Sequence, residues 1–359
     1  MTTVATMIPH SRPSIDEEDV RATAEVLRSR QVAEGPYVER FEQAMAEGIG
    51  LQGGVAVSSG TAALELALRG LRIGAGDEVI MPSYVCQAPW LATHRVGAEA
   101  RLVDIDLQTF NVDPVAAHRA VTEKTRAIIV PHLFGLAADL TALERLGVPL
   151  IEDCAQTLGV MESGRPIGTV GRLTVCSFYA TKLLCAGEGG MVLSNDAALL
   201  DRMRSLREYD GAMKLDPSSF NLKLTDLQAA LGLSQLGRFE SFQERRCLLA
   251  ATYREALSAK AVFLPSVPPG RTHGYYRFVI RLPRFKTNPD GLHGLIQTLE
   301  RSGVSCRKPV FRPLHLYLGQ SGFPYSDEAD RTALSIPLYP DLTDEEVRQI
   351  HQSLTEVLS

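Results

Sequence analysis

The chain has 359 residues and a mass of 39.2 kDa, two or three times the size of a typical single domain. Its formal net charge of -5, without a long basic block, argues against nucleic-acid binding, and its six cysteines form no CxxC pair or zinc-like cluster, so we expect no metal site. The sequence lacks a signal-like N-terminus and any run of about 18 apolar residues, so we expect a cytoplasmic protein with no membrane role.

Two helices are predicted at the N-terminus. Ser14 and Glu17 have the spacing of a capping box, and the acidic residues 16–18 suit the start of a helix that runs to about residue 30. A second helix follows Gly35-Pro36. Its apolar positions recur every three to four residues, at Val38, Phe41 and either Ala44 or Met45.

Residues 55–192 alternate short apolar, β-rich runs with helical stretches. This rhythm predicts an α/β sandwich with a mostly parallel sheet of about seven strands and helices on both faces. Residues 196–258 are predicted to be helical and to include one long connecting helix that begins near residue 221. A smaller α+β domain follows, so we divide the chain at residues 1–240 and 241–359, with the N-terminal segment available to pack on the smaller domain.

The segment Val57-Ser-Ser-Gly-Thr-Ala-Ala-Leu64 places small residues, including Gly60 and Thr61, at a turn between a strand and a helix. Free backbone N–H groups and the helix dipole favour an anion such as phosphate at such a turn. An ordinary helix cap with a tight glycine turn explains the same residues.

Two adjacent carboxylates, Glu152 and Asp153, end the buried run VPLIEDC. Ligands of open parallel sheets bind at the carboxyl edge of the strands, and a buried carboxylate requires a partner. A protonated pyridine nitrogen satisfies that need, and so does a structural salt bridge or a helix cap.

A single lysine, Lys182, stands just beyond another buried run in TVCSFYATKLLCAGEGG. Ser177 and Thr181 precede it with hydroxyls suited to a phosphate, and a glycine cluster follows. A free lysine with a pKa of about 10.4 is a poor nucleophile near pH 7, and desolvation or a Schiff base removes that handicap. A phosphate turn, an acid and a lysine in this order are the parts of a pyridoxal 5′-phosphate (PLP) site.

These residues resemble the DegT/DnrJ/EryC1/StrS family of PLP-dependent aminotransferases, which act on keto sugars, usually nucleotide-linked, and on some cyclitols. The resemblance covers nearly the whole chain, through SRPSIDEEDV, EGPYVERFE, SSGTAALELAL, GDEVIMPSY, IEDCAQTLG, SFYATK, GEGGMV, NLKLTDLQAALGLSQL and LSIPLYPDLTDEEV. It implies PLP fold type I, similar to aspartate aminotransferase. It also implies a homodimer with active sites at the subunit interface.

The resemblance assigns roles to individual residues. Lys182 looks like the Schiff-base lysine and proton carrier, and Asp153 looks like the partner of the pyridinium nitrogen. Gln156 looks like a contact to the phenolic oxygen of the cofactor. The expected phosphate ligands are Gly60, Thr61, Ser177 and, from the neighbouring subunit, Asn221. The implied reaction moves an amino group from L-glutamate or L-glutamine to a keto sugar in amino-sugar biosynthesis.

One position departs from the family pattern. Where many members carry an aromatic residue that stacks on the cofactor, this chain has Cys86. Tyr84 or Trp90 is an alternative source of the stack, although Trp90 reads better as a helix core residue. Candidate substrate contacts are Tyr84, His132, His315 and Tyr317, near Arg307, with His132 expected in the wall of the cleft and His315 equally well explained as a structural histidine.

Three other functions remain open from the sequence. A PLP-dependent sugar dehydratase shares the scaffold, but family members of that type replace the lysine with histidine, whereas this chain has Lys182. A cyclitol aminotransferase differs only in its acceptor. A non-catalytic regulator is disfavoured because Asp153, Ser177 and Asn221 are also present.

Overall fold

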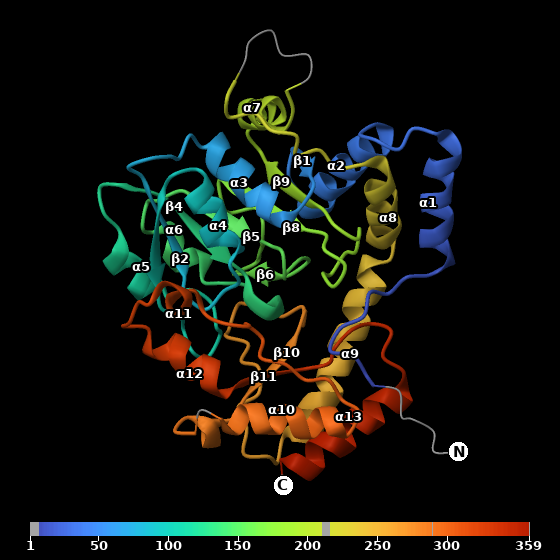
Figure 1. The fold of residues 1–359 in the computed structure, drawn as a ribbon, viewed down its shortest axis with the longest axis vertical. Coiled ribbons are helices and arrows are strands. Elements are labelled where there is room, and N and C mark those ends of the chain that lie inside the picture. Colours follow the sequence, from blue (N-terminus) through green and yellow to red (C-terminus); the bar gives the residue numbers. More distant parts are fainter. Residues whose placement is uncertain (1–6, 210–215, 289, 359) are drawn as a thin grey trace.

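A seven-stranded sheet forms the centre of the protein in this computed structural model, which describes residues 7–209, 216–288 and 290–358 (Figure 1). The strand order is β1-β9-β8-β5-β4-β2-β3, and β9 alone runs antiparallel to its two neighbours. The sequence prediction of about seven mostly parallel strands is therefore confirmed. The strands are β1 (Gly53–Val57), β2 (Glu78–Pro82), β3 (Glu99–Val103), β4 (Thr125–Pro131), β5 (Leu150–Asp153), β8 (Leu173–Ser177) and β9 (Gly190–Ser194).

Helices cover both faces of the sheet, and side chains of each strand alternate between the two resulting cores. In β4, Ala127 and Ile129 pack in the first core, whereas Ile128 and Val130 pack in the second. The first core is covered by α3 (Gly60–Gly70), α4 (Ala88–Arg95) and α7 (Ala197–Arg207). The second is covered by α2 (Pro36–Ile49), α5 (Pro114–Ala120), α6 (Leu140–Glu144) and α8 (Asp226–Gly237).

The predicted N-terminal helix is present as α1 (Glu17–Ser29), but its cap is not the predicted one. Asp16, immediately before the first helical residue, accepts hydrogen bonds from the backbone N–H groups of Glu18 and Asp19, and Asp19 accepts one from Asp16 in return. Ser14 lies too far before the helix to cap it and is buried. The helix α2 begins after Gly35 as expected, with Met45 rather than Ala44 among its buried residues.

The single connecting helix predicted from residue 221 is wrong. Residues 221–224 are not helical: Lys223 forms an isolated β-bridge with Val57, and Leu222 accepts a 2.8 Å hydrogen bond from the N–H of Ser58 beside β1. The first helix, α8, starts only after the capping box of Thr225 and Gln228. At the end of α8, the backbone of Arg238 is not helical, and Asp16 and Asp19 of the α1 region bind its guanidinium. The next helix, α9 (Phe239–Leu257), begins at the following residue.

The C-terminal region builds a third core and also returns to the first one. The third core contains Leu249, Phe278 and Ile350, together with Ile8 from the N-terminal segment. Its elements include α9, β10 (Phe278–Arg281), α10 (Gly291–Arg301), β11 (Ala333–Ile336) and α13 (Asp344–Val357). By contrast, α11 (Leu314–Leu318) and α12 (Pro324–Thr332) place residues in the first core. The division after residue 240 remains a prediction.

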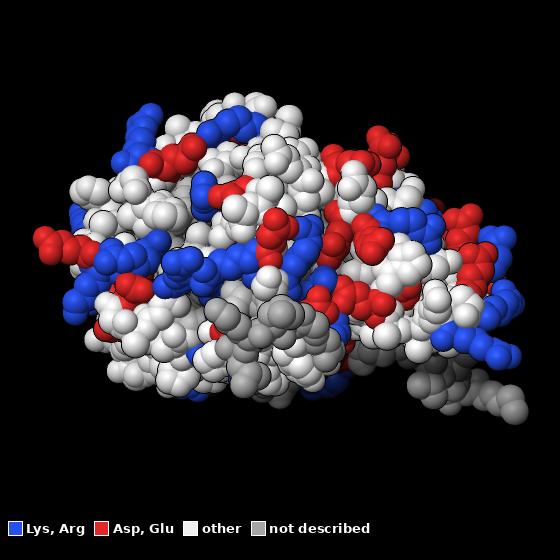
Figure 2. Space-filling view, turned by 90° about the horizontal axis from the view of Figure 1, so that it is seen from above, with Lys and Arg blue, Asp and Glu red and all other residues white. Residues whose placement is uncertain are grey.

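Short elements complete the described chain, namely η1 (Leu133–Gly135), β6 (Met161–Glu162), β7 (Arg165–Pro166) and η2 (Pro283–Phe285). Within the described residues, no helix combines the length and apolar composition needed to cross a membrane. On the face seen from above, basic and acidic side chains are interspersed along with uncharged surface (Figure 2). This mixture agrees with the small net charge of the sequence.

Candidate active site

The predicted phosphate turn is assembled from two elements distant in the sequence. Gly60 begins α3, with Ser59 as the N-cap, and Ser177 ends β8. A Cβ atom added to Gly60 would lie only 2.7 Å from Cβ of Ser177. The first N–H groups of a helix have no partner within the helix, so Gly60 and Thr61 present donors beside the Ser177 hydroxyl. The glycine is required because a side chain would fill this space.

The lysine segment is a compact loop between β8 and β9. The N–H groups of Phe178 and Ala180 donate to the carbonyls of Gly189 and Gly187, each at 2.9 Å, and Lys182 N–H donates to Tyr179 at 2.8 Å. Gly187 and Gly189 have φ values of 77° and 152°, a region that favours glycine. The glycine cluster noted in the sequence thus folds the loop that presents Lys182.

Asp153 ends β5 and has only 8% of its surface exposed. One oxygen accepts a 3.0 Å hydrogen bond from the N–H of Ala155. Burial raises the pKa of Asp153, and the Lys182 cation and His132 offset this only in part. A buried carboxylate with a raised pKa gains most from a nearby cationic donor.

Glu152, the neighbour of Asp153, is completely buried and fully bonded. Backbone N–H groups of Gly168, Val170 and Gly171 donate to it at 2.6–2.8 Å, and His132 Nε2 lies 3.0 Å away. Burial by itself raises the pKa of Glu152, but the hydrogen bonds and His132 outweigh burial and lower it. This carboxylate therefore supports the strand end and is closed to ligands.

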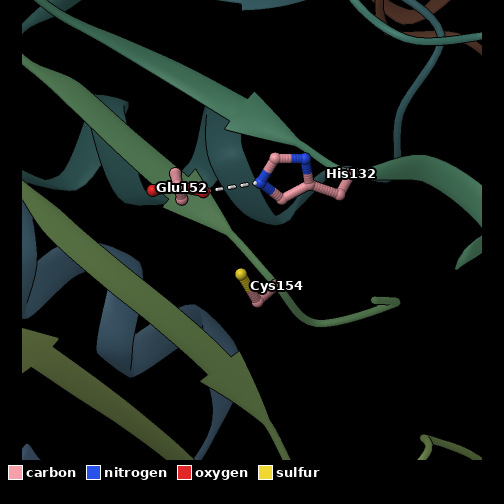
Figure 3. Close-up of side chains that lie close together, drawn as sticks. All are labelled: His132, Glu152 and Cys154. Atoms are coloured by element: carbon pink, nitrogen blue, oxygen red, sulfur yellow. Dashed lines mark hydrogen bonds and ion pairs between the residues drawn. The ribbon is translucent and has the colours of Figure 1, made fainter. Parts of the chain in front are cut away.

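Cys154 joins His132 and Glu152 in a group whose potential ligand atoms lie within 4.8 Å of one another (Figure 3). The geometry suits internal hydrogen bonding better than a metal. Nδ1 of His132 accepts the N–H of Ala138 at 3.0 Å, so Nε2 carries the proton that it donates to Glu152. Both imidazole nitrogens of His132 therefore already have a hydrogen-bond partner. Burial raises the pKa of the Cys154 thiol well above its usual range.

Gln156 follows the same strand, and its side-chain oxygen accepts a 3.1 Å hydrogen bond from the N–H of Phe134. This bond orients the amide so that its NH2 group is left to donate to a ligand.

Asn221 is exposed, next to the segment where Leu222 bonds to Ser58. An exposed side chain at this place is available to a second subunit.

Cys86 lies close enough to Lys182 and Asp153 to interact with their charges. Its side chain is exposed in the single chain, yet surrounding protein raises the pKa of its thiol, and the Lys182 cation opposes that shift. Tyr84 is completely buried and packs against Phe110, so it belongs to the core and offers no surface for stacking or substrate. Trp90 stacks on His94 within α4 and packs on the first core, as its helix position favoured.

The other candidate substrate residues separate into buried and accessible ones. His132 is completely buried, so it does not contact a ligand directly. His315 is also buried, with Nδ1 2.5 Å from the Ser83 hydroxyl and Nε2 3.1 Å from Asp327, which supports the structural alternative. Tyr317 is 43% exposed, and Arg307 is exposed as well.

Two residues near Lys182 were missed in the sequence. Nζ of Lys182 lies 5.4 Å from the ring centroid of Tyr276, and the guanidinium of Arg277 lies 5.4 Å from the same ring. Both residues lie immediately before the strand β10, which starts at Phe278. The contact between Lys182 and Tyr276 joins segments almost 100 positions apart, so no local sequence pattern predicts it.

The model of the DegT/DnrJ/EryC1/StrS aminotransferase family matches residues 13–355. The chain belongs to this family. Similar proteins include the "Pleiotropic regulatory protein" of Geobacillus stearothermophilus, 33% identical over 94% of both chains. The GDP-perosamine synthase of Vibrio cholerae is 31% identical over 96% of this chain and 97% of its own. The structure titled "Putative sugar aminotransferase Spr1654 from Streptococcus pneumoniae, PLP-form" is 26% identical, with a TM-score of 0.90 over 98% of this chain and all of that one.

The family identifies the protein as a PLP-dependent aminotransferase with PLP fold type I. The described residues fit this cofactor. Gly60 leaves space that a Cβ would fill beside the Ser177 hydroxyl, as a phosphate requires. Asp153 has a raised pKa and few donors, as a partner for a ring N–H requires, and Lys182 lies close enough to influence it. Asp153 ends β5, Ser177 ends the neighbouring strand β8, and Lys182 follows in the loop after β8, whereas Gly60 follows β1, which is separated from β8 by β9.

Proposed function

We propose that this aminotransferase moves the amino group of L-glutamate or L-glutamine to the ketone of a sugar, in most cases nucleotide-linked, in amino-sugar biosynthesis. The observation that carries the proposal is the convergence of Lys182, Asp153 and the Gly60–Ser177 turn at one edge of the sheet. The substrate class is supported by relatives whose names specify sugar aminotransfer and GDP-perosamine synthesis.

Each residue has a distinct task in this proposal. The N–H groups of Gly60 and Thr61 and the Ser177 hydroxyl hold the phosphate, and Gln156 donates its NH2 to the phenolic oxygen. Asp153 keeps the ring nitrogen protonated. Lys182 would hold the cofactor through its side-chain amine and, when that amine is free, would carry a proton.

Bound PLP supplies a carbonyl carbon for amines and a ring that withdraws electrons. Asp153 strengthens that withdrawal because its carboxylate stabilises the proton on the ring nitrogen, and its burial removes competing water. The Lys182 amine would hold a proton and return it in both half-reactions. The two half-reactions therefore use the same lysine.

The working unit in this proposal is a homodimer in the cytoplasm. Asn221 of one subunit reaches the phosphate held by the other, which its exposure in the single chain permits. Cys86 takes the place of the stacking aromatic residue, and Tyr317 is the accessible one of the four candidate substrate residues. A complete site then requires both subunits.

The test is a visible absorption spectrum of the protein with PLP, before and after L-glutamate, beside Lys182→Ala. We expect the wild type to form the absorbance band of lysine-bound cofactor and to lose it with glutamate, and the variant to form no such band. An unchanged band in Lys182→Ala would refute the lysine assignment. Keto-sugar nucleotides, unlinked keto sugars and keto-cyclitols added to the glutamate-treated enzyme then identify the acceptor, which restores the band.

The name of the Geobacillus relative favours a regulatory role as a second candidate. The intact Lys182, Asp153 and Ser177 argue for chemistry, because a protein without turnover has no need for an amine beside a buried acid. Glutamate conversion of the bound cofactor separates the two, since a purely regulatory protein would leave it unchanged. The same assay exposes a dehydratase, which would consume the sugar without taking nitrogen from glutamate.

A further inference from the structure

The segment that carries Asn221 lies along the outer edge of the sheet. The strand β1 is the edge strand next to β9, so the backbone groups on its outer side need partners from outside the sheet. Lys223 forms an isolated β-bridge with Val57, and the carbonyl of Leu222 accepts the N–H of Ser58 at 2.8 Å. Asn221 is therefore held beside the connection between β1 and the phosphate turn.

The carboxamide of Asn221 is oriented by its own segment. Its oxygen accepts the N–H of Lys223 at 3.4 Å, and the residue is exposed. Because the oxygen is bonded to the chain, the NH2 group is the part of the amide left to donate to a ligand. A phosphate accepts hydrogen bonds, so this orientation suits a phosphate held by a neighbouring subunit.

A buried arginine, Arg207, anchors the backbone on both sides of Asn221. Arg207 is the last residue of α7 and is 5% exposed. Its carbonyl accepts the N–H of Leu222 at 2.9 Å, and the carbonyl of Leu206 accepts the N–H of Phe220 at 3.1 Å. The position of Asn221 therefore depends on where α7 ends.

The guanidinium of Arg207 fixes the end of α7 against β1 and α2. Nη1 donates to Glu42 at 2.9 Å and to the carbonyl of Ala56 at 3.2 Å, and Nη2 pairs with Glu34. The same oxygen of Glu42 accepts the N–H of Ala56 at 2.7 Å, so these two side chains bond both backbone groups of Ala56. The planar fork of arginine holds several acceptors in a fixed geometry, whereas lysine offers a single ammonium on a flexible stem.

We propose that Arg207 is a positioning residue for the active site of the neighbouring subunit. It holds the backbone around Asn221 on the edge of β1 and thereby orients the Asn221 NH2 group toward the cofactor phosphate bound by the partner. The inference rests on the proposed homodimer with shared sites. The hydrogen bond between Leu222 and Ser58 also connects this segment to the phosphate turn of its own subunit, so an effect across the interface must be separated from one within the subunit.

Mixed dimers make that separation, because only a site that contains Lys182 reports PLP binding through the absorbance of lysine-bound cofactor. In the first dimer, one subunit carries Arg207→Gln and the other carries Lys182→Ala, so the reporting site receives Asn221 from a subunit with an intact Arg207. In the second dimer, one subunit carries both substitutions and the other is wild type, so the reporting site receives Asn221 from the altered subunit. The subunits are co-expressed with different affinity tags and purified through both.

Both mixed dimers contain the same two substitutions and differ only in their arrangement. We expect the second dimer to bind PLP about tenfold more weakly than the first, the scale of losing one hydrogen bond to a charged group. The first dimer should match a mixed dimer of wild type and Lys182→Ala. Equal affinities, or the opposite order, would overturn the proposal, because Arg207 would then act on the fold in general or within its own subunit.

The matched control is Arg204→Gln in the same two arrangements. Arg204 also lies in α7 and donates to β1, through the carbonyl of Gly54 at 3.3 Å, but its carboxylate partner is the exposed Asp201. Both arrangements of this variant should bind PLP equally. If subunits with Arg207→Gln do not fold, Arg207→Lys decides in the same arrangements, since it keeps the cation but loses the fork, and the expected order of the two dimers is unchanged.

Asn221→Ala in the two arrangements tests the shared site itself. If it produces no difference between the dimers, the proposed shared site fails. If Asn221→Ala separates the dimers and Arg207→Gln does not, only the positioning inference fails. In homodimers, adding Arg207→Gln to Asn221→Ala should weaken PLP binding no further, because Arg207 acts through Asn221.

Discussion

Glu152 and Asp153 are adjacent carboxylates at the end of one strand, yet they have opposite properties. Glu152 is bound by three backbone N–H groups and His132, and its pKa is lowered. Asp153 has one described donor, the N–H of Ala155, and its pKa is raised. Strand alternation explains the contrast, because Ile151 packs in the first core and Leu150 in the second, so successive side chains face opposite layers. The carboxylate with unused acceptor capacity is the one available for chemistry.

The largest expected effect comes from removing the closed carboxylate. Glu152→Leu leaves three N–H groups and His132 without their acceptor inside the protein, which should lower the free energy of unfolding by about 3–5 kcal/mol. Urea unfolding of the cofactor-free protein measures the change. Glu152→Gln, which keeps one acceptor oxygen, should lose less. Equal stability of wild type and Glu152→Leu would contradict the structural role.

The open carboxylate should affect turnover instead of folding. Asp153→Asn keeps the shape of the side chain but removes the charge proposed to hold the ring proton, so turnover should fall by about 100-fold, the scale for losing one preorganised electrostatic group. A coupled assay for glutamate consumption, with PLP saturating, measures the loss. Undiminished turnover would remove Asp153 from the mechanism.

The contributions of Glu152 and Asp153 to the free energy of unfolding should change with pH in opposite directions. The pKa of Glu152 is lowered by folding, so its stabilisation is complete above its ordinary value of 4.5 and disappears as pH falls through the folded-state pKa. The pKa of Asp153 is raised, so its cost is absent below its ordinary value of 3.8 and grows as pH rises through the folded-state pKa. Cofactor-free Asp153→Asn should therefore gain stability over wild type at neutral pH and lose that gain in acid. Urea unfolding between acid and neutral pH tests this, and a gain that persists in acid would contradict it.

A smaller effect is expected at the phosphate turn, which shares the open edge of the sheet with Asp153. Gly60→Ala places a Cβ 2.7 Å from Cβ of Ser177, so the turn must shift, at a cost of about 1–3 kcal/mol, and PLP should bind more weakly. Gly294→Ala in α10 is the matched control, because nothing lies within 4 Å of its added Cβ. Cofactor fluorescence and urea unfolding compare the two. Equal PLP affinity in both variants would show that the turn does not hold the phosphate.

The smallest effect is expected at Tyr317, which is 43% exposed, in contrast to the buried His315 two residues before it. Tyr317→Ala should change stability by less than about 0.5 kcal/mol. If Tyr317 contacts the acceptor, KM for the sugar should rise about fivefold with kcat unchanged, which corresponds to about 1 kcal/mol of binding. Unchanged steady-state kinetics would exclude the contact.

The sequence by itself determined the strands, the α/β class and the order of the cofactor parts, because strand and turn signals are local and Lys182, Asp153 and Ser177 each follow an apolar run. The break at Arg238 was missed because Asp16 and Asp19, more than 200 positions away, bind that side chain. Only the tertiary structure showed that Tyr84, His132 and His315 are buried, since the same residue types serve equally as core or ligand contacts. It alone placed Tyr276 beside Lys182. Burial and charge contacts between distant segments depend on how the chain is packed in three dimensions, and these decide which polar residues stay open for chemistry.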